Sequence, residues 1–422
     1  MSGALDDPRR STVARHATLP TPTAFSSFLK ILGISLSVLV VSAVAVAGFV
    51  ASDLLNRVGE GAVALEDSAE VAPPSLGAYP DDKAFSILVV GTDECGEITT
   101  QLLGERCEDQ DGGVRNDVNL LVHVSAAPRN VTVVSFPRDL MVEVPECTKD
   151  DGSTASSMSK APLNSVFEHA GVSCVAKTVT GLSDIPIEFA AKISFDGVIE
   201  ITDAIGGVEV CVAGDGIRDS QAGINLPVGT HTVSGADALA FIRTRHGVGD
   251  ESDLARISNQ QQYMSRLAKK ILSAETLSDP STVLRLANTV ADNIVPSESL
   301  SNPLTLSQLA LALKDVRFSD FVFVQYPNLD DPDNPGIKVV PDESAAEPLW
   351  AALAAGEPIS LSGDVATNDS VELSTPDPAP DPAPDDAAAT PDATAAPRAT
   401  LPPEISGQSV DQETCSVGNQ SR

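Results

Sequence analysis

The sequence predicts a layered α/β domain that follows a single transmembrane helix. Three observations lead to this prediction. An uncharged run of about 22 residues lies near the amino terminus, long enough to cross roughly 30 Å of hydrocarbon as a helix. Apolar strand-like runs then alternate with helical patterns, as in layered α/β domains. After Ser362 comes a Pro-, Ala- and Asp-rich tract that is too poor in large apolar residues to build a core.

The charge balance excludes some classes of function. The 422 residues include 27 Lys and Arg against 59 Asp and Glu, a formal net charge of −32. A surface of this charge repels polyanions, so no nucleic acid partner is expected. A transcriptional regulator would need most of the chain in the cytoplasm and a basic DNA-binding element, and both topology and charge oppose it.

The uncharged run covers residues 31–52. Basic residues precede it and acidic residues follow it, so the positive-inside rule places residues 1–30 in the cytoplasm and the rest outside the cell membrane. A cleaved signal peptide is the alternative, but the run is longer than a usual signal-peptide core and starts about 30 residues into the chain. We therefore expect an uncleaved, single-pass anchor, followed by a polar stalk over residues 53–80.

The six cysteines fit an extracytoplasmic location. None lies in a CxxC spacing or alternates with histidine at zinc-ligand intervals, so disulfides are the better interpretation. The pairing stays open. Cys95 with Cys107 would close a polar loop, and Cys147 with Cys174 would brace another. Cys211 lies in an apolar strand, where it can simply be buried packing.

The globular region opens with an apolar, strand-like run at residues 84–91. Two more strands are predicted over residues 118–124 and 131–136, and the Pro and Asn between them indicate a turn and an antiparallel hairpin. The segment FDGVIEITDAIGG has a helical pattern that stops at two glycines, as a helix end does. Apolar strand-like runs flank that segment.

The hairpin predicts where charged side chains gather. In an antiparallel pair the start of the first strand lies beside the end of the second, which brings Arg115 and Asp117 next to Arg138. Asp93 follows the first apolar strand and joins them if that strand neighbours the hairpin. Two carboxylates near phosphate-binding arginines suit Mg²⁺, which prefers oxygen ligands. The alternative is that Asp117 and Asp139 only form surface ion pairs, worth about 0 to 1 kcal/mol each.

A second basic cluster follows further along the chain. Arg243 and Arg245 come after a short predicted helix, and an extended segment would point both to one face. Arg256 and Gln260 are four apart on the next predicted helix and share a face, and Asp253 is placed to cap its start. Converging guanidinium groups bind phosphate oxygens bidentately, so we interpret the cluster as a pyrophosphate clamp. A solvated helix face is the alternative interpretation.

Seven segments occur in a characteristic order between residues 84 and 272. They are GTDE, RNDVNLLVHV, SFPRDL, APLNSVFEHAG, DAIGGVEV, LPVGTHTVSGADALAFIRTRH and DLARISNQQ. In order and spacing they resemble the LytR-CpsA-Psr family of membrane-anchored cell-envelope phosphotransferases, and the Ala-rich, Lys-poor composition resembles actinobacterial members. The resemblance implies a three-layer α/β/α sandwich with a central mixed sheet, which encloses an apolar pocket for an isoprenoid tail.

The resemblance also implies roles for individual residues. Asp93 and Asp117 match the family's magnesium-coordinating aspartates, and with Arg138 they are the expected catalytic residues. The expected ligands of the substrate pyrophosphate are Arg115, Arg138, Lys160, Arg243, Arg245, Arg256 and Gln260.

The implied activity is Mg²⁺-dependent transfer of a glycopolymer phosphate from a polyprenyl-pyrophosphate carrier to a muramic-acid hydroxyl of peptidoglycan. An active-site aspartate or a metal-bound oxygen would deprotonate the hydroxyl. The expected partners are a polyprenyl-pyrophosphate-linked glycan, peptidoglycan and the membrane. The alternative is a non-catalytic protein that binds the lipid-linked glycan; the two aspartates favour the enzyme, because binding alone could use arginines. The sequence does not identify the polymer, although the actinobacterial resemblance favours arabinogalactan.

The sequence predicts three further parts of the chain after the stalk. The expected catalytic domain covers residues 81–275, residues 276–362 form a helical extension of it, and residues 363–422 form a disordered tail that either serves as a spacer or has no specific role.

Two positions depart from the family pattern. Many relatives have an arginine shortly after the first aspartate, where Glu94 and Cys95 stand here and open a loop to Cys107. Relatives also often have an arginine before the helix glutamine, where this chain has Asn259. The second departure predicts the loss of one phosphate donor.

Overall fold

The computed structural model describes residues 61–68, 70–104, 107, 113–366, 369–374 and 398–419, with scattered residues between 32 and 59. Contacts divide the chain into residues 1–53 and 54–422, and the second unit contains the fold described below. The predicted cytoplasmic tail and most of the predicted span at 31–52 lie outside the described residues. Among the residues that are described, no helix combines the length and the apolar character needed to cross a bilayer.

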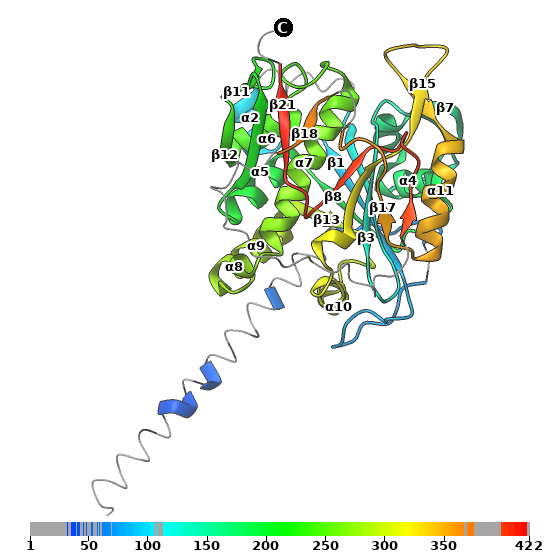
Figure 1. The fold of residues 1–422 in the computed structure, drawn as a ribbon. Coiled ribbons are helices and arrows are strands. Elements are labelled where there is room, and N and C mark those ends of the chain that lie inside the picture. The colour runs from blue at the N-terminus through cyan, green and yellow to red at the C-terminus, as the bar shows by residue number, and fades with distance from the viewer. Residues whose placement is uncertain are drawn as a thin grey trace, which may run out of the picture. The chain divides into compact units, whose positions relative to one another are not determined.

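A seven-stranded mixed sheet lies at the centre of this unit (Figure 1). Its strands, in spatial order, are β13 (Ile294–Pro296), β8 (Phe189–Ile193), β1 (Phe85–Thr92), β2 (Asn116–Val124), β3 (Val131–Phe136), β14 (Phe321–Gln325) and β20 (Gly407–Ser409). β2 pairs antiparallel with β1 on one side and with β3 on the other, whereas β8 runs parallel to β1 and β14 runs parallel to β3. The predicted hairpin and the mixed α/β fold are confirmed.

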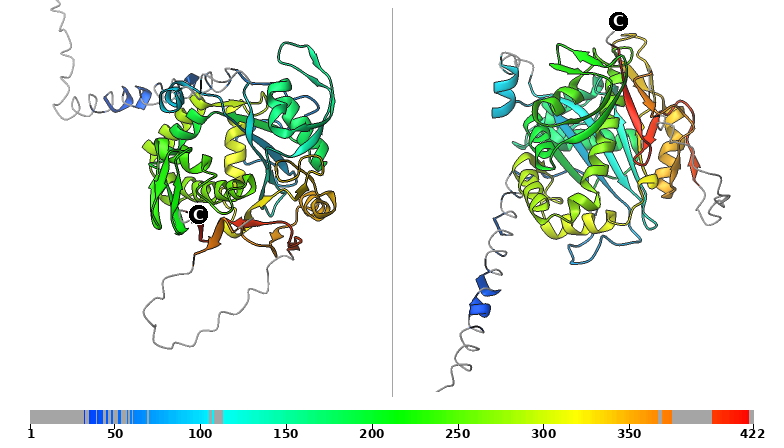
Figure 2. Two further views of the ribbon diagram at one scale, coloured as in Figure 1. Left: turned by 90° about the horizontal axis from the view of Figure 1, so that it is seen from above. Right: turned by 60° about the vertical axis from the view of Figure 1, so that its left-hand side comes forward.

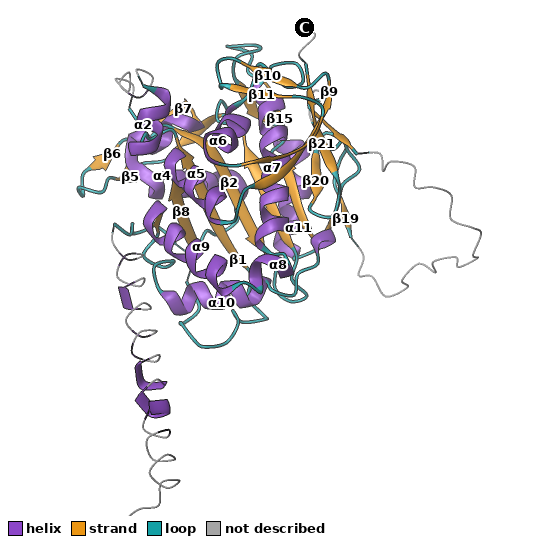
Figure 3. Ribbon diagram, turned by 90° about the vertical axis from the view of Figure 1, so that its left-hand side faces the viewer, coloured by secondary structure: helices purple, strands orange, loops and turns teal. Residues whose placement is uncertain are grey.

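Helices pack on both faces of this sheet, because successive strand residues point to opposite faces. Leu88 and Leu121 share one core with α4 (Val166–Ser183) and α11 (Glu343–Ala355). Leu120 and Val133 share the other core with α10 (Pro303–Leu313) and α7 (Asp253–Ile271). Figures 2 and 3 show the strands running between these two helical layers.

The remaining elements surround this centre. The helices are α2 (Glu97–Leu103), α5 (Phe195–Ala204), α6 (Gly235–Arg243), α8 (Ala274–Leu277) and α9 (Pro280–Asn293). Paired short strands are β4 (Met141–Val144) with β7 (Met158–Pro162), β5 (Cys147–Thr148) with β6 (Thr154–Ala155), β10 (Ile217–Asp219) with β11 (Ile224–Leu226), β15 (Asn328–Asp330) with β16 (Val339–Pro341), and β17 (Ile359–Ser360) with β19 (Ala399–Thr400). α5 ends where predicted, before Gly206 and Gly207, whose φ values are 79° and 91°.

The carboxyl-terminal residues correct one prediction. A second sheet has the order β12 (Gly229–Val233), β9 (Val208–Gly214), β21 (Thr414–Gly418) and β18 (Val371–Leu373), and β20 extends the central sheet. The prediction of disorder over residues 363–422 is therefore wrong for residues 369–374 and 398–419, while 375–397 lie outside the described residues. These short strands carry few large apolar groups, and their order depends on pairing with distant strands.

Three disulfides join the described cysteines. Cys95–Cys107 and Cys147–Cys174 confirm the two suggested pairs. Cys211 is not unpaired packing, because it bonds to Cys415 across a sequence separation of 204 residues. A partner so distant carries no local sequence signal.

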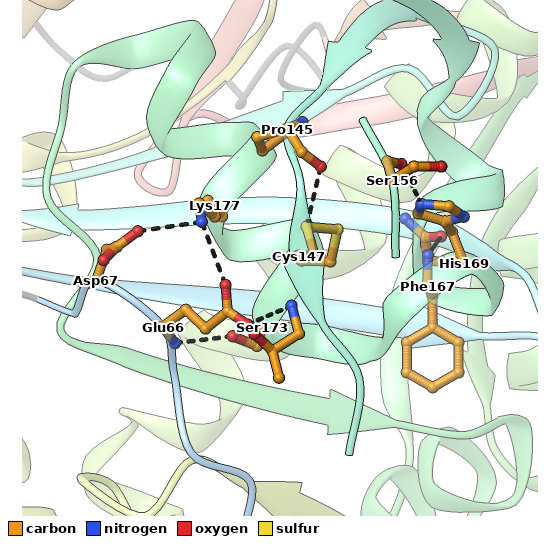
Figure 4. The surroundings of a disulfide bond; sticks show 12 residues. Glu66, Asp67, Pro145, Cys147, Ser156, Phe167, His169, Ser173 and Lys177 are labelled. Carbon is orange, nitrogen blue, oxygen red and sulfur yellow. Dashed lines mark hydrogen bonds and ion pairs between the residues drawn. A yellow bond between two sulfur atoms is a disulfide. The ribbon is translucent and has the colours of Figure 1, made fainter. Parts of the chain in front are cut away.

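The predicted polar stalk is also corrected in its second half. Glu66 N–H donates to Ser173 Oγ at 2.8 Å, and Lys177 Nζ lies 3.2 Å from a carboxylate oxygen of both Glu66 and Asp67 (Figure 4). Tyr79 is 1% exposed and its ring packs 4.8 Å from that of Phe85. Residues 61–68 and 70–80 thus lie against the domain, and Ala72 and Tyr79 belong to its core.

The region predicted as a helical extension is part of the central sheet. It contributes α8 to α11, but also β13 at one edge and β14 between β3 and β20. Its strand-like FVFVQ segment pairs with β3 in parallel over its full length.

Candidate functional site

A cleft of about 430 Å³ lies at one end of the central sheet. Four strand ends meet there: β1 and β8 finish, β2 begins, and β3 leads into Pro137 and Arg138. The carboxyl end of α6 and the first two turns of α7 complete the wall. Seven of the nine predicted site residues line this cleft, namely Asp93, Arg115, Asp117, Arg138, Arg243, Arg256 and Gln260.

The β1–β2 pair places both predicted metal ligands. Gly91 stands opposite Val118, and a Cβ at Gly91 would come within 2.9 Å of the Val118 side chain, so the strands approach closely. Asp93 then follows β1 and exchanges contacts with Arg115: its N–H donates to Arg115 O at 3.1 Å, and its Oδ1 accepts from Arg115 N at 2.7 Å. Asp117 is the second residue of β2.

The pKa of Asp93 reflects its burial and the charge of Asp117. Burial raises this pKa above its usual value of 3.8, and the charge of Asp117 raises it further. The Arg115 N–H acts in the opposite direction but does not outweigh these effects. The cleft therefore holds two negative groups that repel each other, an arrangement that a cation would relieve.

Arg138 connects these carboxylates to α7. Its Nη1 lies 3.2 Å from Asp117 Oδ1, and its Nε lies 3.2 Å from Asp253 Oδ1 and 3.4 Å from Asp139 Oδ2. Asp253 Oδ1 is also 2.5 Å from Arg256 Nη2. Burial acts to lower the pKa of Arg138, yet the three carboxylates together raise it above its ordinary value. The predicted ion pair between Asp117 and an arginine is present, and it lies inside the cleft.

Arg243 and Arg245 do not share a face, contrary to our prediction. Arg243 is the last residue of α6 and its guanidinium carbon lies 5.1 Å from the ring centre of Phe195, and the backbone becomes extended at Thr244. Arg245 points elsewhere: its Nε donates to Glu251 O at 2.7 Å. The period-of-two argument fails because the helix continues through Arg243.

Lys160 is likewise outside the cleft. It lies on β7, and its Nζ contacts Asp331 at 2.7 Å and Asp333 at 2.5 Å. Asp331 is fully buried. Lys160 therefore joins β7 to the β15–β16 hairpin, a distant partner that spacing along the chain does not reveal.

Three residues that support the cleft are not predicted, or are predicted in another role, from the sequence. Asp253 does not cap α7, because Ser252 accepts the capping bond from Ala255 N; Asp253 instead faces Arg138 and Arg256. Phe195 supports Arg243. The spacing of Asp253 three residues before Arg256 on one helix was an available signal for their pairing.

Asp219 is the third of these residues. It is 2% exposed, and its Oδ2 accepts from Thr244 Oγ1 and from the N–H groups of Arg245 and His246, all at 3.0 Å. Burial acts to raise its pKa, but these donors and two more from its own turn lower it below 3.8. Asp219 thus holds the segment that follows Arg243.

An apolar cavity of about 120 Å³ adjoins the cleft. It lies between the sheet and helices α5 and α7, with Leu120, Phe323, Ile201 and Leu267 among its walls. Both spaces share the wall residues Gly91, Val118, Ile193, Val198, Ile242 and Gln260. A polar head group in the cleft could therefore continue into an apolar tail.

The cleft's donor set suits a cation that takes part of its ligands from a substrate. Among the described residues no group of three or more His, Cys, Asp or Glu side chains is placed to hold a metal. Asp93 and Asp117 supply two carboxylates, which is the number that Mg²⁺ commonly takes from a protein when substrate phosphates complete its shell.

Fold and site together define an α/β protein with an arginine-rich anion cleft beside an apolar cavity. A sequence model of the LytR_cpsA_psr family matches residues 56–353. Because this match covers more than half of the chain, the protein belongs to the LytR_cpsA_psr family.

Individual relatives agree with this membership. The cell wall biosynthesis protein LcpA of Corynebacterium glutamicum is 30% identical over 230 residues, 50% of this chain and 44% of that protein. The polyisoprenyl-teichoic acid–peptidoglycan teichoic acid transferase TagT of Bacillus subtilis is 26% identical over 255 residues, 59% of this chain and 72% of TagT. The chain thus matches less than half the length of LcpA.

The fold has a counterpart among solved structures. A crystal structure of a Streptococcus agalactiae protein aligns with a TM-score of 0.50 and 20% identity, and covers 65% of this chain and 88% of that one. This likeness concerns the fold alone.

Proposed function

We propose that this protein is a membrane-anchored, extracytoplasmic phosphotransferase. It transfers a glycopolymer phosphate from a polyprenyl-pyrophosphate carrier to a muramic-acid hydroxyl of peptidoglycan, and it depends on Mg²⁺. The observation that carries the proposal is the convergence of four arginines, two aspartates and a glutamine on one cleft that continues into an apolar cavity.

The arrangement supports recognition of a lipid pyrophosphate. Guanidinium groups bind phosphate oxygens through paired hydrogen bonds, and several of them balance the charge of a pyrophosphate. The apolar cavity suits the first isoprene units of a polyprenyl chain. Gln260 lines both spaces and its Nε2 donates to Ile242 O at 3.1 Å, which orients its amide oxygen and nitrogen at the boundary.

Asp93 and Asp117 are the residues that would hold Mg²⁺. When bound, the ion supplies Lewis-acid neutralisation of phosphate charge. The raised pKa of Asp93 supports this assignment, because a cation between the two carboxylates would offset their repulsion.

The proposed reaction is a displacement at phosphorus. The acceptor hydroxyl oxygen forms a bond to the phosphorus that carries the glycopolymer, and the bond from that phosphorus to the bridging oxygen breaks. Polyprenyl phosphate leaves, and the hydroxyl proton passes to a base in the cleft. Arg115, Arg138, Arg243 and Arg256 hold the substrate oxygens in place during this step.

The relatives support the reaction class. TagT is named as a transferase between a polyisoprenyl-linked teichoic acid and peptidoglycan, and LcpA is named as a cell wall biosynthesis protein. Three disulfides also support an oxidising, extracytoplasmic location.

The test is direct transfer in vitro. The protein is incubated with a polyprenyl-pyrophosphate glycan and peptidoglycan oligomers, with and without Mg²⁺, and polyprenyl phosphate and the phosphodiester product are followed by mass spectrometry. We expect both products only with Mg²⁺. Tight binding of the lipid-linked glycan without product from any acceptor would instead identify a non-catalytic binding protein.

A further inference from the structure

The described carboxyl-terminal segment, residues 407–419, lies beyond the family match at 56–353, yet it contacts the helix that carries Arg256 and Gln260. Ser416 Oγ donates to Asn259 Oδ1 at 2.6 Å. Thr414 O accepts from Gln262 Nε2 at 3.2 Å and from Arg266 Nη2 at 3.0 Å. One short strand thus binds three successive turns of α7.

Asn259 also contacts α6, the helix that ends at Arg243. Its Nδ2 donates to Phe241 O at 2.8 Å, two residues before Arg243 at the end of α6. Both Asn259 and Ser416 are completely buried, so water cannot replace either bond at low cost. A single amide therefore ties β21, α6 and α7 together through its one donor and one acceptor side.

The same segment also holds the loop between the two helices. Val417 O accepts from Gly249 N at 3.1 Å, and Asn419 Nδ2 donates to Gly249 O at 3.1 Å. Asn419 N donates to Gly247 O at 3.3 Å. Residues 414–419 therefore contact α7 and the loop between the two helices directly, and they reach α6 through Asn259.

The segment itself is firmly attached. β20 pairs with β14, β21 pairs with β9, and Cys415 is bonded to Cys211. Glu413 forms ion pairs with Arg266 and Lys269 of α7. These contacts make the segment a rigid support.

We infer that residues 407–419 are a positioning element for the pyrophosphate clamp, with the Ser416–Asn259 bond as its central contact. This inference rests on the proposed function and assigns Asn259 a new role. The family pattern predicts that Asn259 is a lost phosphate donor, but its side chain does not line the cleft and instead sets the place of Gln260 and Arg243. Neither Ser416 nor Asn259 touches substrate.

The experiment compares three full-length variants in detergent. Ser416→Ala removes the hydroxyl that reaches Asn259, and Ser416→Thr retains a hydroxyl. Ser409→Ala is the matched control, because Ser409 lies in the same segment but its hydroxyl bonds Asp411 rather than α7. Geranyl pyrophosphate and geraniol are the probes of the clamp and of the apolar cavity. Hydrogen exchange of residues 235–262 without ligand is the second readout.

We expect Ser416→Ala to weaken geranyl pyrophosphate binding by about threefold to tenfold and to leave geraniol binding unchanged. Exchange in α6 and α7 should accelerate in the same variant. Ser416→Thr and Ser409→Ala should stay within about twofold of the unaltered protein.

Two results would overturn the inference: geranyl pyrophosphate binding by Ser416→Ala equal to that of the unaltered protein, or equal loss for both probes, which is the signature of general destabilisation. If the unaltered protein does not prefer geranyl pyrophosphate to geraniol, the proposed function fails instead. Hydrogen exchange then decides the positioning role alone, and unchanged exchange in Ser416→Ala overturns it.

Discussion

Arg138 Nη1 lies 3.2 Å from both carboxylate oxygens of Asp117. The same guanidinium contacts Asp139 and Asp253 through Nε. Because two carboxylates remain if Asp117 is removed, Arg138 would not be left as an unpaired buried charge. The role of Asp117 in the reaction can therefore be separated from its role in the fold.

Asp117→Ala should lower transfer on the order of 100-fold or more, because the cleft loses one of two carboxylates able to hold Mg²⁺. The melting temperature should change by only a few degrees. Turnover by mass spectrometry and thermal unfolding measure the two effects. Asp292→Ala is the matched control, since Asp292 also pairs with an arginine, Arg57 at 2.7 Å, but lies outside the cleft. Full activity of Asp117→Ala would refute the assignment.

Phe195 should set the affinity for the lipid donor through Arg243. Replacing its ring by Leu removes a cation–π contact worth about 0.5 to 1 kcal/mol, so KM for the donor should rise about twofold to fivefold. Phe195→Tyr retains the ring and should restore the original value. Steady-state kinetics with varied donor measures this, and equal KM for Leu and Tyr variants would count against the contact.

Lys160 and Arg245 should be far less important than Arg243. Arg243→Ala removes a guanidinium from the cleft and should lower kcat/KM for the donor on the order of 100-fold. Lys160→Ala and Arg245→Ala should retain activity within about threefold, because neither side chain lines the cleft. The same transfer assay compares them. A loss in Arg245→Ala as large as that in Arg243→Ala would contradict the arrangement described above.

Asp93→Asn should make the protein more stable while abolishing transfer. The folded pKa of Asp93 is raised, so its ionised form costs stability at neutral pH, and this cost disappears as pH falls through the raised pKa. An amide carries no such charge and can still accept from Arg115 N. Unfolding in urea with EDTA should show a higher free energy of unfolding for the variant than for the unaltered protein at pH 7. The gain should shrink at acid pH; a gain independent of pH would point to another cause.

The pKa of Asp219 is shifted in the opposite direction from that of Asp93. Its folded pKa is lowered, so its ionised form contributes stability above pH 3.8, and this contribution is lost as pH falls through the folded pKa. Asp219→Asn should destabilise the protein by about 2 kcal/mol at pH 7, because an amide cannot accept all five donors. Urea unfolding at pH 7 and pH 3 tests this: the difference between the variant and the unaltered protein should be smaller at pH 3, and an equal difference at both pH values would exclude the carboxylate charge as its source.

Several features were predictable because they depend on neighbours along the chain. Apolar runs and the turn residues between them located β1 and the β2–β3 hairpin, and a helical pattern that stops at two glycines located the end of α5. Antiparallel pairing then brought Asp117 beside Arg138, and two residues four apart on a helix placed Arg256 and Gln260 on one face. The two short-range disulfides follow the same logic, since each closes a loop of limited length.

Other features depend on contacts that no local pattern records. Lys160 lies outside the cleft because it pairs with Asp331, and Arg245 lies outside it because it donates to the backbone oxygen of Glu251. The carboxyl-terminal strands have little apolar content of their own, and they are held by pairing with β9 and β14, by the bond of Cys415 to Cys211 and by contacts with α7. The sequence alone specifies the local secondary structure and which charged residues are available for a site. Which distant residue each side chain contacts is decided only in the folded protein, because packing and the hydrogen bonding of buried polar groups depend on the whole fold.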